Sequence, residues 1–125
     1  MKKYIILLLV VMLLVCGCNS SYWDRCDDDF KKEITIILND FDKDIKLGKI
    51  KNLDLNSDTF AKEFSENFEA EIYMNNEDEQ YISILVYHIL KNVNNRYKSK
   101  ELTKKEFIEY LKAAKRESIR IIKEP

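Results

Sequence analysis

The sequence predicts an all-α domain, a small bundle of about four helices. Three observations predict this class. Charged residues make up 34% of the 125-residue chain, which contains only two glycines and one proline. Such a composition suits helices and argues against a turn-rich sandwich or a disordered tail. Apolar residues recur every three or four positions in four segments, and polar residues suited to helix N-capping precede most of these segments.

The first 17 residues have the composition of a signal peptide. Lys2 and Lys3 form a basic start, and an apolar run of 12 residues follows from Tyr4 to Val15. A membrane-spanning helix needs roughly 20 apolar residues, whereas the core of a signal peptide is shorter. We therefore expect residues 1–17 to be removed. The alternative is an uncleaved N-terminal anchor helix.

The apolar run ends in Val15-Cys16-Gly17-Cys18, and this stretch resembles the lipobox of bacterial lipoprotein precursors. The family's motif is an aliphatic residue, a short residue, then Gly, Ala or Ser, and finally the cysteine that receives the lipid. The resemblance implies cleavage after Gly17, lipidation of Cys18 through a thioether, and acylation of the new amino terminus, with palmitate as the expected fatty acid. It covers only about the first 20 residues and implies nothing about the mature domain.

Lipid on Cys18 would anchor the protein to a bacterial membrane. Acyl chains contribute about 0.8 kcal/mol per buried CH₂, so two or three chains make anchoring lasting. Asn19 follows the cysteine. In the enteric type of lipoprotein sorting an Asp at this position retains the protein on the inner membrane, so the resemblance favours the outer membrane. We expect the domain to face the periplasm or the cell exterior.

The cysteine count leaves one thiol in the mature chain. Cys16 leaves with the signal peptide, Cys18 carries the lipid, and only Cys26 remains. A single thiol forms neither an intramolecular disulfide nor a cysteine metal site. Cys26 is then a free thiol, a half-buried apolar residue or one half of an intermolecular bridge.

Between the lipid and the first helix we place a short connection. Residues 18–26 are assigned to a lipidated tether, and residues 27–125 to the helical domain. Tyr22 and Trp23 lie in this tether, where amphipathic aromatic side chains would rest at the level of the lipid headgroups. Alternatively, Trp23 packs beneath the bundle.

The first helix is expected from Asp28 to about Leu47. Three aspartates at 27–29 lie at its start, where the helix macrodipole favours anions. Gly48 follows the last apolar residue and is a natural stop. The stripe that the helix would bury has the helical period and consists of Phe30, Ile34, Ile37, Leu38, Phe41 and Ile45.

The second helix is expected from Asp58 to about Tyr73, with Ser57 or Asp58 as its N-cap. Its apolar residues recur every fourth position, which is typical of a face packed in a core. The alternative is that this aromatic stripe lines a pocket for a small apolar ligand. The stripe consists of Phe60, Phe64, Phe68 and Ile72.

The third helix is expected from Glu77 to about Tyr97. Asn76 with Glu79 three residues later resembles a capping box. Residues 82–90 are apolar on more than one face, which suits the central helix of a bundle. A strand paired with residues 71–74 is the alternative, and the length of about 20 residues favours the helix.

The fourth helix, Lys104–Lys123, has the clearest start. Thr103 and Glu106 form a capping box, and Leu102 and Phe107 flank it as a hydrophobic staple. Its inner face is expected to contain Phe107, Tyr110, Leu111, Ala114, Ser118 and Ile121.

Charge is distributed unevenly along the mature chain. Residues 18–80 hold 17 acidic and 8 basic residues, a net of −9, whereas residues 81–125 hold 5 and 11, a net of +6. One interpretation is that acidic helices one and two pair with basic helices three and four at the seams of the bundle. The other is a basic surface, at residues 98–105 and 112–123, that meets anionic lipid or an acidic partner.

No known catalytic or cofactor motif is present, and we expect no enzymatic activity, no cofactor and no metal. His88 is the only histidine, and its place in an apolar run predicts a partly buried structural role. Asp40, Asp42 and Asp44 begin like an EF-hand loop, but Ile45 and Lys51 replace its essential Gly and Glu. We expect these aspartates on the solvated face of the first helix. Nucleic acid is not an expected partner, because no binding motif appears.

The sequence therefore predicts a lipid-anchored envelope protein whose domain binds another protein. Small lipoproteins of this type serve as exclusion, immunity, inhibitor or assembly factors. The alternative is a helical module that binds a small ligand in the phenylalanine stripe.

Overall fold

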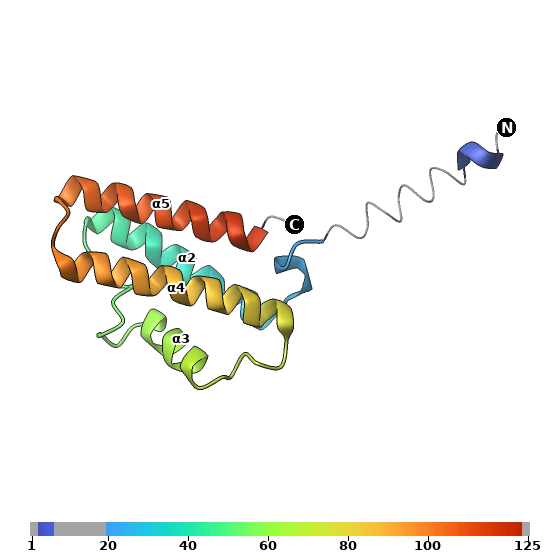
Figure 1. The fold of residues 1–125 in the computed structure, drawn as a ribbon, viewed down its shortest axis with the longest axis horizontal. Helices are drawn as coiled ribbons and strands as arrows, with labels where there is room; N and C mark the ends of the chain where they lie inside the picture. The colour runs from blue at the N-terminus through green and yellow to red at the C-terminus, as the bar shows by residue number, and fades with distance from the viewer. Residues whose placement is uncertain (1–2, 7–19, 124–125) are drawn as a thin grey trace.

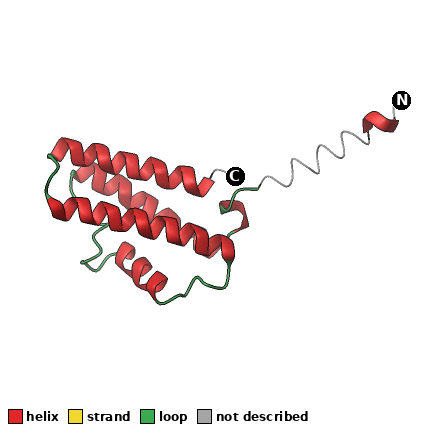
Figure 2. Cartoon of the chain, in the orientation of Figure 1, coloured by secondary structure: helices red, strands yellow, loops and turns green. Residues whose placement is uncertain are grey.

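A computed structural model describes residues 3–6 and 20–123 of the chain. Among these residues there is no strand (Figure 2). The predicted all-α class is confirmed, and the alternative strand at residues 82–90 is wrong. The elements after residue 20 are the 3₁₀ helix η1 (Trp23–Arg25), α2 (Asp28–Leu47), α3 (Phe60–Glu69), α4 (Glu77–Ser99) and α5 (Lys104–Lys123).

The three long helices lie side by side, and α3 covers α4 on the side away from α5 (Figure 1). Helices α2 and α4 begin at the same end of the bundle, and α5 runs back toward that end. We call it the η1 end, and it comprises residues 20–28, 77–80 and 120–123. The opposite end, which we call the lysine end, comprises residues 46–51 and 96–105.

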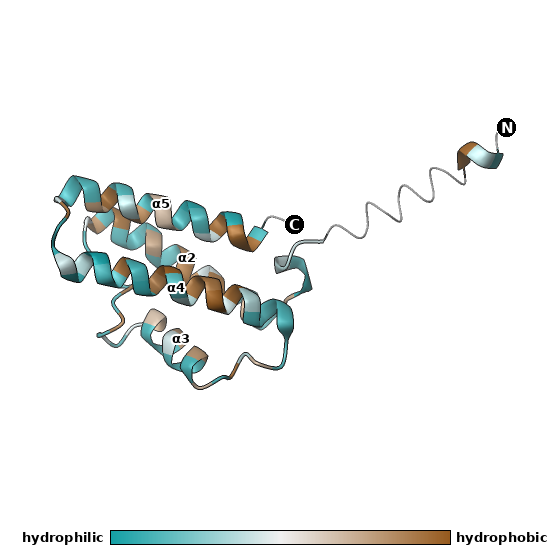
Figure 3. Cartoon of the chain, in the orientation of Figure 1, coloured by the Kyte–Doolittle hydropathy of each residue, from teal (hydrophilic) through white to brown (hydrophobic). Residues whose placement is uncertain are grey.

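The core is formed by buried apolar residues from each of the four helices, and hydrophobic and hydrophilic residues alternate along these helices (Figure 3). Phe41, Phe64 and Leu90 are among its largest fully buried side chains. The connection from α2 to α3 also enters the core, because Ile50 and Leu53 are buried. The predicted stripe of the first helix is confirmed, with Leu38 and Ile45 partly buried at its edges.

The ends of three helices follow the predicted signals. Helix α2 stops at Gly48, whose φ of 64° lies in the left-handed region that favours glycine. The Asn76 side chain accepts hydrogen bonds from the backbone N–H groups of Asp78 and Glu79 at the start of α4. At the start of α5, Thr103 and Glu106 bond reciprocally at 3.3 and 2.7 Å, which is the predicted capping box.

Helix α3 is shorter than predicted at both ends. Thr59, rather than Ser57 or Asp58, caps it by accepting from the backbone N–H of Lys62. Beyond Glu69 the chain turns away, since Glu71 has a φ of 62°. Ile72 is consequently 57% exposed and does not belong to the buried stripe.

The prediction for His88 is wrong. His88 is exposed on α4 rather than partly buried, because the buried face of that helix follows residues such as Val86, Leu90 and Val93. The predicted inner face of α5 is confirmed, since each of its six residues is buried or partly buried. Ile122, which the prediction omitted, is fully buried beside the partly buried Ile121.

Charge pairing across the seams is present but sparse. Lys91 of α4 lies 3.6 Å from Glu69 of α3, and Lys115 of α5 pairs with Asp42 of α2. Both pairs join an acidic early helix to a basic late helix, as the first interpretation of the charge distribution predicted. All four side chains are at least one-quarter exposed, so each pair contributes at most about 1 kcal/mol.

Candidate functional site

The predicted lipidation site, Cys18, lies outside the described residues, as does Cys16. The description resumes at Ser20, two residues after Cys18. The Arg25 guanidinium donates to the Ser20 carbonyl at 2.7 Å and to its hydroxyl at 3.1 Å, and also pairs with Asp78 of α4 at 3.1 Å. Arg25 therefore links the chain to the bundle from Ser20 onward.

Most of the expected tether belongs to the folded domain. Residues 20–26 form the greater part of the predicted tether, but they pack against α4. Ser21 is buried, the rings of Tyr22 and Tyr81 stack at 4.4 Å, and Trp23 packs against the core. Of the two alternatives predicted for Trp23, packing beneath the bundle is the one that the structure shows. The domain thus begins about six residues earlier than the predicted boundary at residue 27.

Cys26 is a buried free thiol. Its Sγ donates to the backbone carbonyl of Tyr22 at 3.2 Å. Burial raises the pKa of the thiol from 9.0 to about 11, and the carboxylates of Glu79 and Asp78 add to the increase. Because the thiolate is the reactive form, Cys26 is poorly reactive at neutral pH.

Glu79 joins the beginnings of two helices at the η1 end. Its carboxylate accepts a hydrogen bond of 3.0 Å from the backbone N–H of Asp27, the residue that precedes α2. The capping-box pattern predicts that Glu79 bonds to the start of its own helix, α4. Its side chain instead bonds at the start of the neighbouring helix, α2. This bond between residues 52 apart fixes how α2 and α4 start together.

Asp44 organises the backbone at the lysine end. This carboxylate is fully buried, contrary to the expected solvated face. It accepts hydrogen bonds of 2.9 to 3.2 Å from the backbone N–H groups of Lys51, Asn52 and Leu53 and from the Asn52 side-chain amide. A signal for this burial is present in the sequence, because Asp44 lies three residues after Phe41 and seven after Ile37, on the apolar stripe.

A small cavity of about 160 Å³ opens at the lysine end, between the end of α4 and the start of α5. Gly48 forms part of its wall, and a Cβ placed there would lie 2.6 Å from the Lys104 Cε. The close approach therefore requires glycine or a displaced lysine. The remaining lining residues combine basic and apolar side chains: Arg96, Tyr97, Lys100, Leu102, Lys104 and Phe107.

The lysines around this cavity carry uncompensated charge. Seven lysines of the lysine end are exposed, and none lies within ion-pair distance of a carboxylate among the described residues. The sequence predicts only part of this surface, because the basic surface expected from it consists of residues 98–105 and 112–123. The seven are Lys46, Lys49, Lys51, Lys98, Lys100, Lys104 and Lys105.

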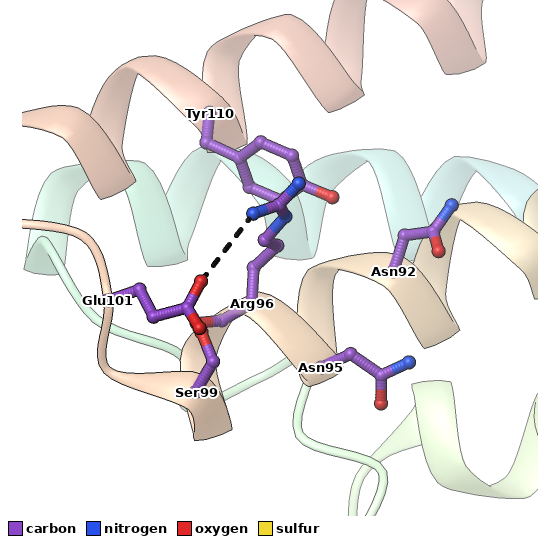
Figure 4. A pocket seen from close by; sticks show the side chains of 6 residues that line it. All are labelled: Asn92, Asn95, Arg96, Ser99, Glu101 and Tyr110. Carbon is purple, nitrogen blue, oxygen red and sulfur yellow. Dashed lines mark hydrogen bonds and ion pairs between the residues drawn. The ribbon is translucent and has the colours of Figure 1, made fainter.

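Arg96 links the small cavity to a second, more polar hollow along α4 and α5 (Figure 4). Its guanidinium lies 4.0 Å from the Glu101 carboxylate, beside the Tyr110 ring. Burial raises the pKa of the Tyr110 hydroxyl, and the Arg96 charge opposes this increase. Asn92, Asn95 and Ser99 complete the lining of this hollow.

The phenylalanine stripe of α3 is part of the core. Phe64 is fully buried and packs on Tyr73 with ring centroids 5.5 Å apart. Phe68 packs on Tyr87 at 4.5 Å. Phe60 is partly buried against the same cluster. Phe64 and Phe68 are occupied by these contacts, whereas Phe60 also borders an open surface hollow whose other lining residues are polar or charged.

Two further kinds of feature, a metal site and a membrane-spanning helix, are absent from the described residues. No three His, Cys, Asp or Glu side chains come together in a way that would hold a metal ion. No helix in residues 3–6 and 20–123 has both the length and the apolar character needed to cross a membrane.

No protein-family model matches the chain, and neither a curated protein nor a solved structure matches it significantly.

Proposed function

We propose that the protein is a lipoprotein of a bacterial envelope, anchored by lipid on Cys18, and that its domain binds another protein there. Its role would be that of an exclusion, immunity, inhibitor or assembly factor. The lipobox-like residues 15–18 support the anchor, and the Asn that follows Cys18 favours the outer membrane.

The proposed anchor would orient the domain. Cys18 precedes Ser20 by two residues, and two extended residues span at most about 7 Å. Ser20 is itself bonded to Arg25 on the bundle. A lipid on Cys18 would therefore hold the η1 end directly at the membrane, and the lysine end would project away from it.

The observation that carries protein binding is the surface of the lysine end. Its seven exposed lysines lack carboxylate partners within the described residues, and two large apolar side chains are exposed among them, Leu47 at 45% and Tyr97 at 39%. Exposed apolar side chains rimmed by polar ones are typical of an interaction site, and a surface of one charge favours a partner of the opposite charge.

The anchor is tested by mass spectrometry of the native product. A mature chain that begins at an acylated Cys18 is expected, and Cys18→Ala should leave the protein unprocessed or released from membranes. An intact amino-terminal Met without fatty acid would contradict the proposal.

Protein binding is tested by photo-crosslinking in the native membrane, with the crosslinker at residue 104 or at residue 116. A discrete adduct of the lipidated protein that is lost in Cys18→Ala is expected. The absence of any protein adduct from both positions would contradict the binding function.

A further inference from the structure

We propose that the lysine end is a docking site for an acidic polypeptide segment, which places one apolar side chain in the cavity beside Tyr97. This inference rests on the proposed function, since it names the chemistry of the partner. Charge, the shape of the cavity and the distance from the anchor each support it.

The concentration of positive charge at the lysine end is unfavourable for the isolated domain. Lys104 and Lys105 are the first two residues of α5, where the helix macrodipole favours anions over cations. Lys46 and Lys98 lie in the last turns of α2 and α4, where the macrodipole favours cations, but together with Lys49, Lys51 and Lys100 they add repulsion between like charges at the same end. Elsewhere on the bundle, Arg25, Lys91 and Lys115 pair with carboxylates from other elements.

The cost of this repulsion disappears when an anionic partner covers the lysines. A surface of one sign also raises the local concentration of oppositely charged partners and accelerates their association. A segment rich in Asp and Glu supplies carboxylates to these seven lysines, none of which has one within ion-pair distance in the described part of the domain.

The cavity suits a polypeptide better than a bare anion. Its lining combines three apolar or aromatic side chains, Tyr97, Leu102 and Phe107, with three basic ones, Arg96, Lys100 and Lys104. A volume of about 160 Å³ equals that of about five water molecules, which suits a single apolar side chain. An acidic peptide with one Leu or Phe matches both kinds of lining residue.

The lysine end is also distant from the proposed anchor. Helix α2 has 20 residues, which at 1.5 Å per residue separates the two ends by about 30 Å. The attraction of basic residues to anionic headgroups falls off within a Debye length of about 8 to 10 Å. When the bundle stands upright on the η1 end, the lysines lie beyond the reach of that membrane's lipids.

The test measures binding of a labelled peptide to the full lipidated protein in vesicles of phosphatidylcholine. The probe is a seven-residue peptide with six Glu around a central Leu, and the matched probe has Ser at the centre. We expect saturable binding of the Leu peptide that weakens with added salt, and binding of the Ser peptide that is about fivefold weaker.

The decisive comparison is between two charge-reversed proteins. Lys100→Glu/Lys104→Glu reverses two charges in the lining of the cavity. Arg116→Glu/Lys123→Glu reverses two exposed charges at the other half of α5. We expect at least a tenfold loss of affinity for the first and less than a twofold change for the second. Circular dichroism checks that both proteins fold, and Lys100→Gln/Lys104→Gln replaces the first if it does not.

Several outcomes would overturn the inference: equal losses in the two variants, no loss in the first, or equal binding of the two peptides. Tighter binding to added phosphatidylglycerol vesicles than to the Leu peptide would identify a lipid surface instead. Failure here is separable from failure of the proposed function. A protein adduct from residue 116 and not from residue 104 keeps the function and rejects this site, whereas peptide binding without any adduct keeps this site and rejects the function.

Discussion

The two ends of the bundle use polar side chains differently. At the η1 end, Arg25, Asp78 and Glu79 are paired with groups on other segments, and the bonds close the start of the domain. At the lysine end, the buried Asp44 fixes the backbone, but the seven exposed lysines around it have no carboxylate partner in the described chain. Paired charge holds the fold together, whereas unpaired charge is available to a partner.

The proposed docking surface at the lysine end has no short sequence motif. A motif is a short run of residues, but the lysine end collects residues from the end of α2, the end of α4 and the start of α5. Its signature is a local excess of one charge that appears only when the helix ends are brought together. Substitutions of the polar side chains that hold the fold together should separate the structural role from the proposed binding role.

Removing the Asp44 carboxylate should produce the largest loss. Asp44→Ala leaves three backbone N–H groups and one amide without their acceptor, at about 1–3 kcal/mol for each donor that stays buried. Some donors will reach water, so we expect a loss of about 3 kcal/mol in unfolding free energy. Urea denaturation followed by circular dichroism measures it. The control is Asp29→Ala, whose side chain is 97% exposed; equal effects of the two would show that Asp44 has no structural role.

At the η1 end, Glu79→Ala should destabilise the domain by about 2 kcal/mol, because a hydrogen bond to a charged acceptor is lost at the start of α2. Glu79→Gln keeps an acceptor oxygen and should lose less than half as much. Hydrogen exchange of the first turn of α2 localises the effect. Unchanged protection of that turn in Glu79→Ala would contradict the assigned contact.

The capping box of α5 should contribute less to the unfolding free energy than the Glu79 contact does. Thr103→Ala removes the acceptor for the Glu106 backbone N–H and should lower the unfolding free energy by about 1 kcal/mol. Thr103→Ser restores the hydroxyl and should recover most of the loss. The Thr103 backbone N–H, and after it the Thr103 hydroxyl, lower the pKa of the Glu106 carboxyl. Thr103→Ala keeps the backbone donor, so the pKa of Glu106 should stay lowered in this variant, and an unchanged unfolding free energy would contradict the cap.

The smallest effect concerns Asp40, which is buried on α2 and bonded to Lys43 at 3.2 Å. Burial raises the pKa of this carboxyl above 3.8, and the Lys43 contact opposes the increase. A raised pKa means that the folded state binds the proton more tightly than the unfolded state does. Ionisation of Asp40 therefore lowers the unfolding free energy as pH rises above about 3.8. Asp40→Asn should give a small gain in unfolding free energy at pH 7 that disappears below about pH 3.8. A loss at pH 7 would show that the Lys43 contact outweighs burial.

Local signals explain most of the predicted helices. Helix α2 has the predicted bounds because its apolar stripe, its acidic start and Gly48 all agree. Helix α5 begins at Lys104 because Thr103 and Glu106 satisfy its first backbone donors. Helix α3 lacked such agreement, since Ser57, Asp58 and Thr59 are all acceptable caps, and contacts of the Thr59 hydroxyl with the Asp54 carbonyl and the Lys62 N–H select among them.

Local sequence is sufficient to predict the helical class, the starts of α2, α4 and α5, and the expectation of a lipid on Cys18. These depend on neighbours within about four residues along the chain, whose interactions are present before the helices pack. The bond from Asp27 to Glu79, the burial of Asp44 and the gathering of seven lysines at one end follow from the packed fold instead. Each of these depends on which helix ends meet in space, and that is set by the packing of the whole core rather than by any short stretch of residues.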